Sequence, residues 1–157
     1  MPGLYYEASY TSLIKHGESI CGDRVEIARA PGSVMAVMSD GLGSGVKANV
    51  LSTLTTRIAS YMLKEGSSID DVVDIVGRTL PICQVRGVAY STFSILQLFE
   101  DGRGILVEYD TPDAFLYRAG TVTKVDTEKR KVGDKLILEG EFEVKDGDHI
   151  FLVTDGV

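Results

Sequence analysis

Two of the four Asp-Gly pairs in the sequence stand where a carboxylate could do chemistry. Asp40 and Asp155 lie in the frames AVMSDGL and FLVTDGV, where an apolar run is followed by a small hydroxyl residue, Asp-Gly and an aliphatic residue. An apolar run without alternation is typical of a strand that is buried on both faces. Both aspartates are therefore expected at the ends of central strands, where a carboxylate that loses hydration needs a partner.

The other two pairs, Asp101-Gly102 and Asp146-Gly147, lie in FEDGRG and VKDGDH. Polar surroundings between two strands are typical of tight hairpin turns, in which Asp-Gly is a favoured dipeptide. Tight turns explain these two pairs, and no chemical role is needed for them.

If the two apolar runs form neighbouring strands that are parallel at these ends, Asp40 and Asp155 converge. Converging carboxylates repel each other, and a shared proton or a bound cation relieves the repulsion. The sequence has only two histidines, His16 and His149, and no cysteine cluster. Oxygen ligands would then select a hard ion such as Mg²⁺ or Mn²⁺. A coincidental turn at each strand end remains the alternative.

The glycines of DGLGSGVKAN have the spacing GxGxG, which matches neither a dinucleotide fingerprint nor a P-loop. A tight turn leading into a helix, with Ser44 as its N-cap, explains them. The N–H groups of such a turn can also help to hold an anion. Gly43 and Ser44 are therefore the candidates for phosphate binding. His149 opens an expected strand, where a structural role is more common than a catalytic one.

The composition is that of an ordinary globular protein and argues against several functions. The 157 residues, of which 44% are hydrophobic, predict a single domain over residues 1–157. The formal net charge of −7 has the wrong sign for binding nucleic acid. No apolar segment is long enough to cross a membrane, and the N-terminus has no signal-peptide pattern. We expect a cytoplasmic protein without a disulfide framework.

Apolar periodicity predicts the elements that position these residues. Strands are expected at residues 5–10, 24–28 and 34–38. A helix should follow the glycines and end near Gly66, and Ser68 should cap a second helix that stops at Pro81. The first helix is expected to use one apolar face, formed by Val46, Val50, Leu54, Ile58 and Met62 and widened by Leu51 and Tyr61.

The pattern after residue 90 changes to strands. The expected strands are at residues 91–99, 104–110, 114–119, 121–125, 135–142 and 149–154. Strands, two helices and then a meander indicate an α+β protein in which helices cover a sheet or a two-sheet sandwich. The charged stretch TEKRKVGDK is interpreted as a solvated hairpin end, with a basic docking patch as the alternative.

Four segments together resemble the metal-dependent PPM (type 2C-like) protein phosphatases, in particular their SpoIIE-like bacterial branch. These segments are ICGD at 20–23, SDGLGSGVKAN at 39–49, RGVAYSTFSILQL at 86–98 and FLVTDGV at 151–157. They occur in the family's order and approximate spacing and cover nearly the whole chain. Within the branch, the combination is most similar to the small stressosome phosphatases.

The resemblance implies an αββα sandwich of two mostly antiparallel sheets with flanking helices. It also implies a centre of two Mn²⁺ or Mg²⁺ ions held by Asp23, Asp40, the main chain of Gly41 and Asp155. Hydroxide formed from a bridging water would attack phosphorus, so no side-chain nucleophile is required. The implied activity is hydrolysis of phosphoserine and phosphothreonine, with phosphorylated STAS-domain proteins of a stress-signalling complex as substrates.

The sequence departs from the family pattern at three places. Leu42 stands where many PPM enzymes have histidine, and YDTPDAFLYR replaces a glycine-rich turn. The family continues beyond the late Asp-Gly with a helix, a strand and another acidic ligand. We therefore expect that the 157 residues are truncated at the C-terminus and bind metal weakly. A non-catalytic pseudophosphatase of the same fold is the main alternative function, and a nucleotide-binding domain is a third.

Overall fold

The computed structural model describes residues 3–12, 22–41, 45–79, 82–83, 88–89, 91–132 and 135–154. Its two helices are α1 (Gly45–Lys64) and α2 (Ile69–Thr79). Its strands are β1 (Asp23–Ala30), β2 (Ser33–Gly41), β3 (Ile82–Cys83), β4 (Val88–Ala89), β5 (Ser91–Phe99), β6 (Arg103–Tyr109), β7 (Phe115–Arg118), β8 (Thr121–Lys124), β9 (Glu128–Val132), β10 (Lys135–Glu143) and β11 (His149–Phe151).

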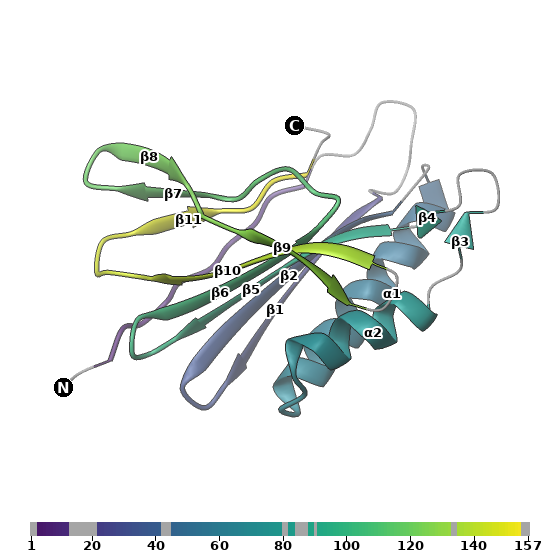
Figure 1. Ribbon diagram of the computed structural model, residues 1–157, viewed down its shortest axis with the longest axis horizontal. Coiled ribbons are helices and arrows are strands. Elements are labelled where there is room, and N and C mark those ends of the chain that lie inside the picture. Colours follow the sequence, from purple (N-terminus) through teal and green to yellow (C-terminus); the bar gives the residue numbers. More distant parts are fainter. Residues whose placement is uncertain are drawn as a thin grey trace.

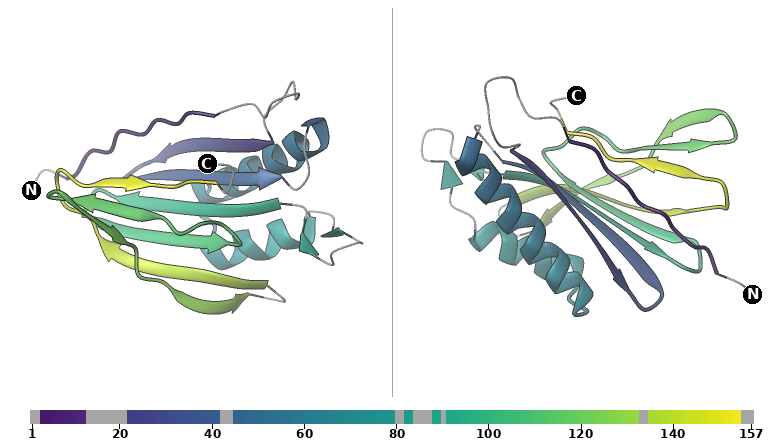
Figure 2. Two further views of the ribbon diagram at one scale, coloured as in Figure 1. Left: turned by 90° about the horizontal axis from the view of Figure 1, so that it is seen from above. Right: turned by 180° about the vertical axis from the view of Figure 1, so that it is seen from behind.

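The strands form two main antiparallel sheets. One sheet has six strands in the order β1-β2-β5-β6-β10-β9, and the other has three in the order β11-β7-β8. Helices α1 and α2 lie against one face of the six-stranded sheet, and the three-stranded sheet lies on its other side (Figures 1 and 2). This confirms the α+β sandwich. The described residues supply one helical layer and both sheets of the expected αββα arrangement.

Alternating side chains of the six-stranded sheet build two separate cores. Met35, Val37 and Ile95 pack with the helices in one core. Val34, Leu96 and Leu106 pack in the other core, between the sheets. The alternation follows from the period of two along a strand, which sends successive side chains to opposite faces.

Helix α1 has the predicted extent, but only part of its predicted face is buried: Leu51 is buried, and Ile58 and Met62 pack against the core under the helices. Val46, Val50 and Leu54 were expected to face the core, yet they are 63%, 49% and 44% exposed. The buried face instead carries small and polar residues beside Leu51 and Leu63, namely Ala48, Ser52, Thr55, Thr56 and Ala59. Helix interiors accept these hydroxyls because each can bond a main-chain carbonyl one turn earlier. Thr55 and Thr56 do so with distances of 2.8 and 2.9 Å.

Helix α2 agrees with the sequence pattern. Ser68 Oγ accepts a hydrogen bond from Asp71 N at 3.2 Å, as an N-cap does. Val72, Val73 and Val76 are buried in the core under the helices. Neither helix among the described residues is long and apolar enough to span a membrane.

One predicted strand is absent, and one strand was not predicted although its segment was expected to belong to a hairpin. Residues 5–10 form no strand, and this irregular segment is held by Leu4 N, which donates to Glu100 O, and by Arg29, which donates to Tyr6 O. The stretch interpreted as a hairpin end contains β9, which pairs with β10. Arg130 of β9 forms ion pairs with Asp70 of α2 and with Glu139 of β10. The ion pairs of Arg130 thus link this edge strand to α2 and to β10.

The two Asp-Gly pairs assigned to turns do form turns. Gly102 and Gly147 have φ angles of 94° and 90° and lie between β5 and β6 and between β10 and β11. Asp101 Oδ1 accepts a hydrogen bond from Arg103 N at 2.9 Å. Glycine tolerates this left-handed backbone because it lacks a Cβ.

Candidate metal centre

The start of β1 and the end of β2 bring two of the expected ligands together. The antiparallel register places Asp23 directly opposite Asp40. Side chains of directly opposed residues lie on the same face of a sheet, with Cβ atoms roughly 5 Å apart. Two carboxylates separated by one β-hairpin are thus neighbours at one end of the six-stranded sheet.

This carboxylate pair faces the space between the two sheets. The next residue pairs of the same face are Val25 with Met38 and Ile27 with Ala36. Ile27 and Ala36 pack against the core between the sheets. Ser39 and Val37 belong to the opposite face, and Val37 is part of the core under the helices.

The face between the sheets changes from polar to apolar along the strands. Asp40 lies opposite Thr92, and the following row contains Ser94 opposite Glu108. Further along, the row that contains Leu96 and Leu106 is apolar and buried. The acidic pair therefore occupies the polar end of an otherwise apolar interface.

The C-terminal frame reaches this end from the other sheet. Thr154 Oγ1 donates a hydrogen bond to Asp23 Oδ2 at 2.9 Å, although the two residues are 131 positions apart. Thr154 follows β11, which belongs to the three-stranded sheet. The assumption that the two Asp-Gly frames are neighbouring parallel strands was therefore wrong, because the frames approach each other across the space between the sheets.

The description of the second frame also needs correction. Phe151 of β11 is 46% exposed, so this apolar run is not a strand buried on both faces. Asp155 lies outside the described residues, as do the phosphate-binding candidates Gly43 and Ser44. Their roles stay predictions.

Gly41 is buried where the end of β2 meets the first turns of α1. A Cβ at Gly41 would lie 2.1 Å from the main-chain oxygen of Ala48, and one at Gly22 would lie 3.1 Å from the Ala48 Cβ. Gly41 N also donates to Gly22 O at 3.1 Å. Glycine at position 41 therefore lets the helix pack directly against the strand that carries Asp40.

The hydroxyl residues that precede the two Asp-Gly pairs have different partners. Ser39 Oγ donates to the main-chain oxygen of Thr92 at 2.7 Å and fixes the end of β2 to β5. Thr154 instead donates to the carboxylate of Asp23. The sequence showed both hydroxyls but gave no reason to expect that one of them would contact an acidic side chain.

Glu108 is a buried carboxyl group that the sequence analysis missed. Its side chain is 2% exposed, and Oε2 accepts a hydrogen bond from Ala114 N at 3.0 Å. Burial raises the pKa of Glu108. Its sequence signal is a single acidic residue inside the apolar run ILVEY. Its hydrogen bond holds the turn where the family has glycines, and Asp110 adopts a φ of 54° there.

The residues present suit a hard divalent cation. Asp23, Asp40 and the main chain of Gly41 offer only oxygen ligands, which Mg²⁺ and Mn²⁺ prefer. Among the described residues, no group of three or more histidine, cysteine, aspartate or glutamate side chains could hold a metal ion. The described part of the candidate site thus offers two neighbouring carboxylates, those of Asp23 and Asp40.

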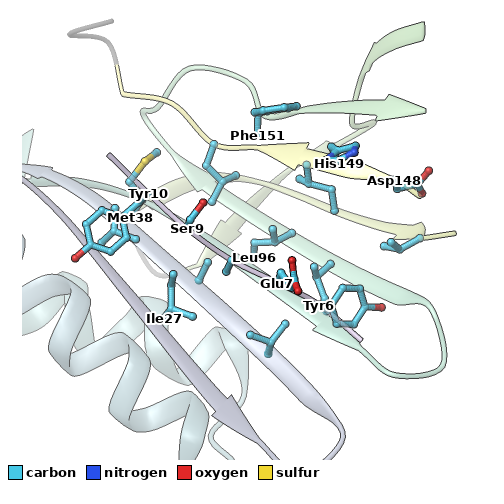
Figure 3. Close-up of a pocket in the computed structure, with 18 of the residues that line it drawn as sticks. Tyr6, Glu7, Ser9, Tyr10, Ile27, Met38, Leu96, Asp148, His149 and Phe151 are labelled. Atoms are coloured by element: carbon cyan, nitrogen blue, oxygen red, sulfur yellow. The ribbon is translucent and has the colours of Figure 1, made fainter. Parts of the chain in front are cut away.

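A cavity of about 360 Å³ lies between the sheets and is lined by Val25 and Met38, the residue pair next to Asp23 and Asp40 on the same face. Figure 3 shows Ile27, Met38 and Leu96 from the six-stranded sheet and His149 from β11 around it. His149 is exposed and its ring centroid lies 5.9 Å from that of Tyr117, its partner on β7. These contacts are those of a residue on a sheet surface, in agreement with a structural role.

Comparisons with known proteins agree with this architecture. Residues 30–157 match the family model described as stage II sporulation protein E (SpoIIE). No curated protein matches the sequence significantly.

Three solved structures illustrate the similarity. The first holds the PP2C phosphatase domain and a fragment of the regulatory domain of SpoIIE from Bacillus subtilis, with a TM-score of 0.78, 19% identity and coverage of 91% of this chain and 43% of that one. A structure from the bacterial stressosome matches with a TM-score of 0.75, 15% identity and coverage of 92% and 74%. RsbX in complex with magnesium matches with a TM-score of 0.71, 19% identity and coverage of 92% and 71%. The chain thus spans less than half the length of the SpoIIE structure.

Proposed function

Because the chain belongs to the SpoIIE family and has the PP2C-type phosphatase fold, we propose that it is a metal-dependent phosphoserine/phosphothreonine protein phosphatase. The observation that carries the proposal is the direct opposition of Asp23 and Asp40 at the polar end of the space between the sheets. These are the positions at which the sequence resembles the family's metal site.

In this proposal, Asp23, Asp40, the main chain of Gly41 and Asp155 hold two Mn²⁺ or Mg²⁺ ions. Such ions, when bound, would neutralise charge on the phosphoryl oxygens and would activate water for hydrolysis of the bond between phosphorus and the serine or threonine oxygen. The protein would need no serine or cysteine nucleophile.

The chain's own residues prepare the site. The hydrogen bond from Ser39 to Thr92 and the packing of Gly41 on α1 fix the end of β2, so Asp40 projects from a rigid strand. The apolar rows next to the acidic pair line the cavity between the sheets. Ligands held on well-packed strands need little rearrangement when a cation binds.

The proposed substrates are phosphorylated STAS-domain proteins of a stress-signalling complex. The similarity to a stressosome structure and to RsbX supports this substrate class. The chain has a formal net charge of −7 and would repel a phosphorylated partner at long range. Bound divalent cations would supply the local positive charge that such a substrate requires.

The test combines Mn²⁺ titration calorimetry with hydrolysis of an aryl phosphate. Asp40→Asn should weaken Mn²⁺ binding at least tenfold and abolish Mn²⁺-dependent hydrolysis. Asp101→Asn removes a carboxylate from the turn between β5 and β6 and is the matched control, which should change neither quantity. Equal Mn²⁺ affinity in Asp40→Asn and in the unaltered chain would contradict the proposal.

A binding module without catalysis is the second candidate. It is favoured by the observation that the described residues gather two acidic ligands and no group of three. A chain that binds a phosphorylated STAS-domain protein but never hydrolyses its phosphate at saturating Mn²⁺ would have this function.

A further inference from the structure

The hydrogen bond between Thr154 and Asp23 joins the two sheets at the acidic end. Asp23 is the first residue of β1 in the six-stranded sheet. Thr154 is the third residue after β11 of the three-stranded sheet. The two side chains meet with an oxygen–oxygen distance of 2.9 Å. The contact therefore links an expected metal ligand to the chain segment that leads to the late Asp-Gly pair.

This contact restricts the carboxylate of Asp23. A hydroxyl that donates to a carboxylate forms a charge-assisted hydrogen bond, which is stronger than a bond between neutral groups. The second side-chain torsion of aspartate has a broad energy minimum, so an unrestrained carboxylate rotates easily. A hydrogen bond to one named oxygen, Oδ2, favours one orientation of the group.

We infer that Thr154 is a positioning residue, whose hydroxyl orients the Asp23 carboxylate for binding a divalent cation. The inference rests on the proposed function, because it concerns the same site. Groups that hydrogen-bond to metal ligands usually affect metal affinity or activity by roughly 10- to 100-fold. Thr154 would thus contribute to the site without touching the cation.

Ser39, the hydroxyl residue before the first Asp-Gly pair, is an internal comparison for Thr154. Ser39 occupies the equivalent sequence position, but its hydroxyl bonds the main chain of Thr92. It secures two strands to each other and contacts no acidic side chain through this bond. Thr154 is the member of the pair whose partner is a carboxylate.

The experiment measures Mn²⁺ affinity by calorimetry in the chain of 157 residues and its variants. Thr154→Val keeps the shape of the side chain and removes the hydroxyl, so it should weaken Mn²⁺ binding by roughly 10-fold or more. Thr154→Ser restores the hydroxyl and should bind within about threefold of the unaltered chain. Thr123→Val is the matched control, because it removes a hydroxyl on the exposed strand β8 that donates to the main-chain oxygen of Leu116 on β7.

A second measurement separates orientation from folding. Thermal unfolding of the metal-free proteins should give nearly the same midpoint for Thr154→Val and Thr123→Val. A large loss of stability confined to Thr154→Val, together with unchanged Mn²⁺ affinity, would assign Thr154 a structural role and overturn the inference.

The two proposals fail in different ways. If Asp23→Asn loses Mn²⁺ affinity but Thr154→Val and Thr154→Ser both bind like the unaltered chain, the positioning role is refuted and the metal site stands. If neither Asp23→Asn nor Asp40→Asn changes Mn²⁺ binding, the metal site is refuted and the role of Thr154 is refuted with it.

Discussion

The substitution Gly41→Ala should separate the end of β2 from helix α1. The added Cβ would lie 2.1 Å from the oxygen and 2.7 Å from the carbon of the Ala48 carbonyl group, whereas ordinary contact begins at 3.4 Å. Main-chain atoms inside a helix cannot rotate away as the end of a side chain can. Overpacking of this kind typically costs 1–3 kcal/mol, and we expect about 3 kcal/mol here.

Urea unfolding followed by circular dichroism measures this loss directly. In thermal unfolding of a chain of this length, the same loss of about 3 kcal/mol corresponds to a fall of roughly 6–12 °C in the midpoint temperature. Gly22→Ala is the matched comparison, because its Cβ would lie 3.1 Å from the Ala48 Cβ and can be accommodated by a small shift. It should cost less than about 1 kcal/mol.

A second substitution at Ala48 tests the reasoning. Ala48→Gly removes the side chain that meets position 22 but leaves the main-chain oxygen that meets position 41. It should therefore relieve the contact made by Gly22→Ala and should not rescue Gly41→Ala. Rescue of Gly41→Ala by Ala48→Gly, or a Gly41→Ala variant as stable as the unaltered chain, would refute the proposed packing of α1 on β2.

Further expectations concern the helix face and two carboxyl groups. Leu51→Ala should lower the free energy of unfolding by about 2–5 kcal/mol, because Leu51 is 5% exposed. Leu54→Ala should lower it by less than about 1 kcal/mol, because Leu54 is 44% exposed. Equal losses would contradict the orientation of α1. Hydrogen bonds from Arg118 lower the pKa of Asp148. The contribution of Asp148 to stability is therefore complete above about pH 3.9 and is lost as the pH falls through the lower pKa of the folded state. Asp148→Asn should remove this dependence in unfolding measured over a pH series. Burial raises the pKa of Glu108, so its contribution to the free energy of unfolding is complete below about pH 4.3 and is lost as the pH rises. Glu108→Gln should flatten this decline in unfolding measured over the same pH series. A plot of stability against pH parallel to that of the unaltered chain would contradict the assignment.

Local patterns predicted most of the elements because they depend on neighbours in sequence. The N-cap at Ser68 and the glycine turns after Asp101 and Asp146 follow from short-range backbone geometry. Strand β9 was missed because its sequence is mostly charged, and the ion pairs of Arg130 with Asp70 and Glu139 join it to other elements.

The buried face of α1 could not be read from apolar spacing. The helix carries apolar residues on more than one side, and the side that fits closely against the sheet is the one with small residues such as Ala48 and Ala59. The predicted face was therefore right at Leu51, Ile58 and Met62 and wrong at Val46, Val50 and Leu54. Sequence periodicity contains no information on how closely a strand end approaches the helix.

The residues of the candidate site could be predicted from the sequence, whereas their arrangement depends on the tertiary structure. The chemistry of carboxylates and glycines, together with the family resemblance, predicted Asp23, Asp40, Gly41 and Asp155 as ligands of a hard cation before any fold was known. Only the register of β1 on β2 places Asp23 opposite Asp40, and only the packing of the two sheets brings Thr154 to Asp23. Contacts between residues more than a hundred positions apart depend on how whole sheets stack, and no local pattern in the chain encodes that.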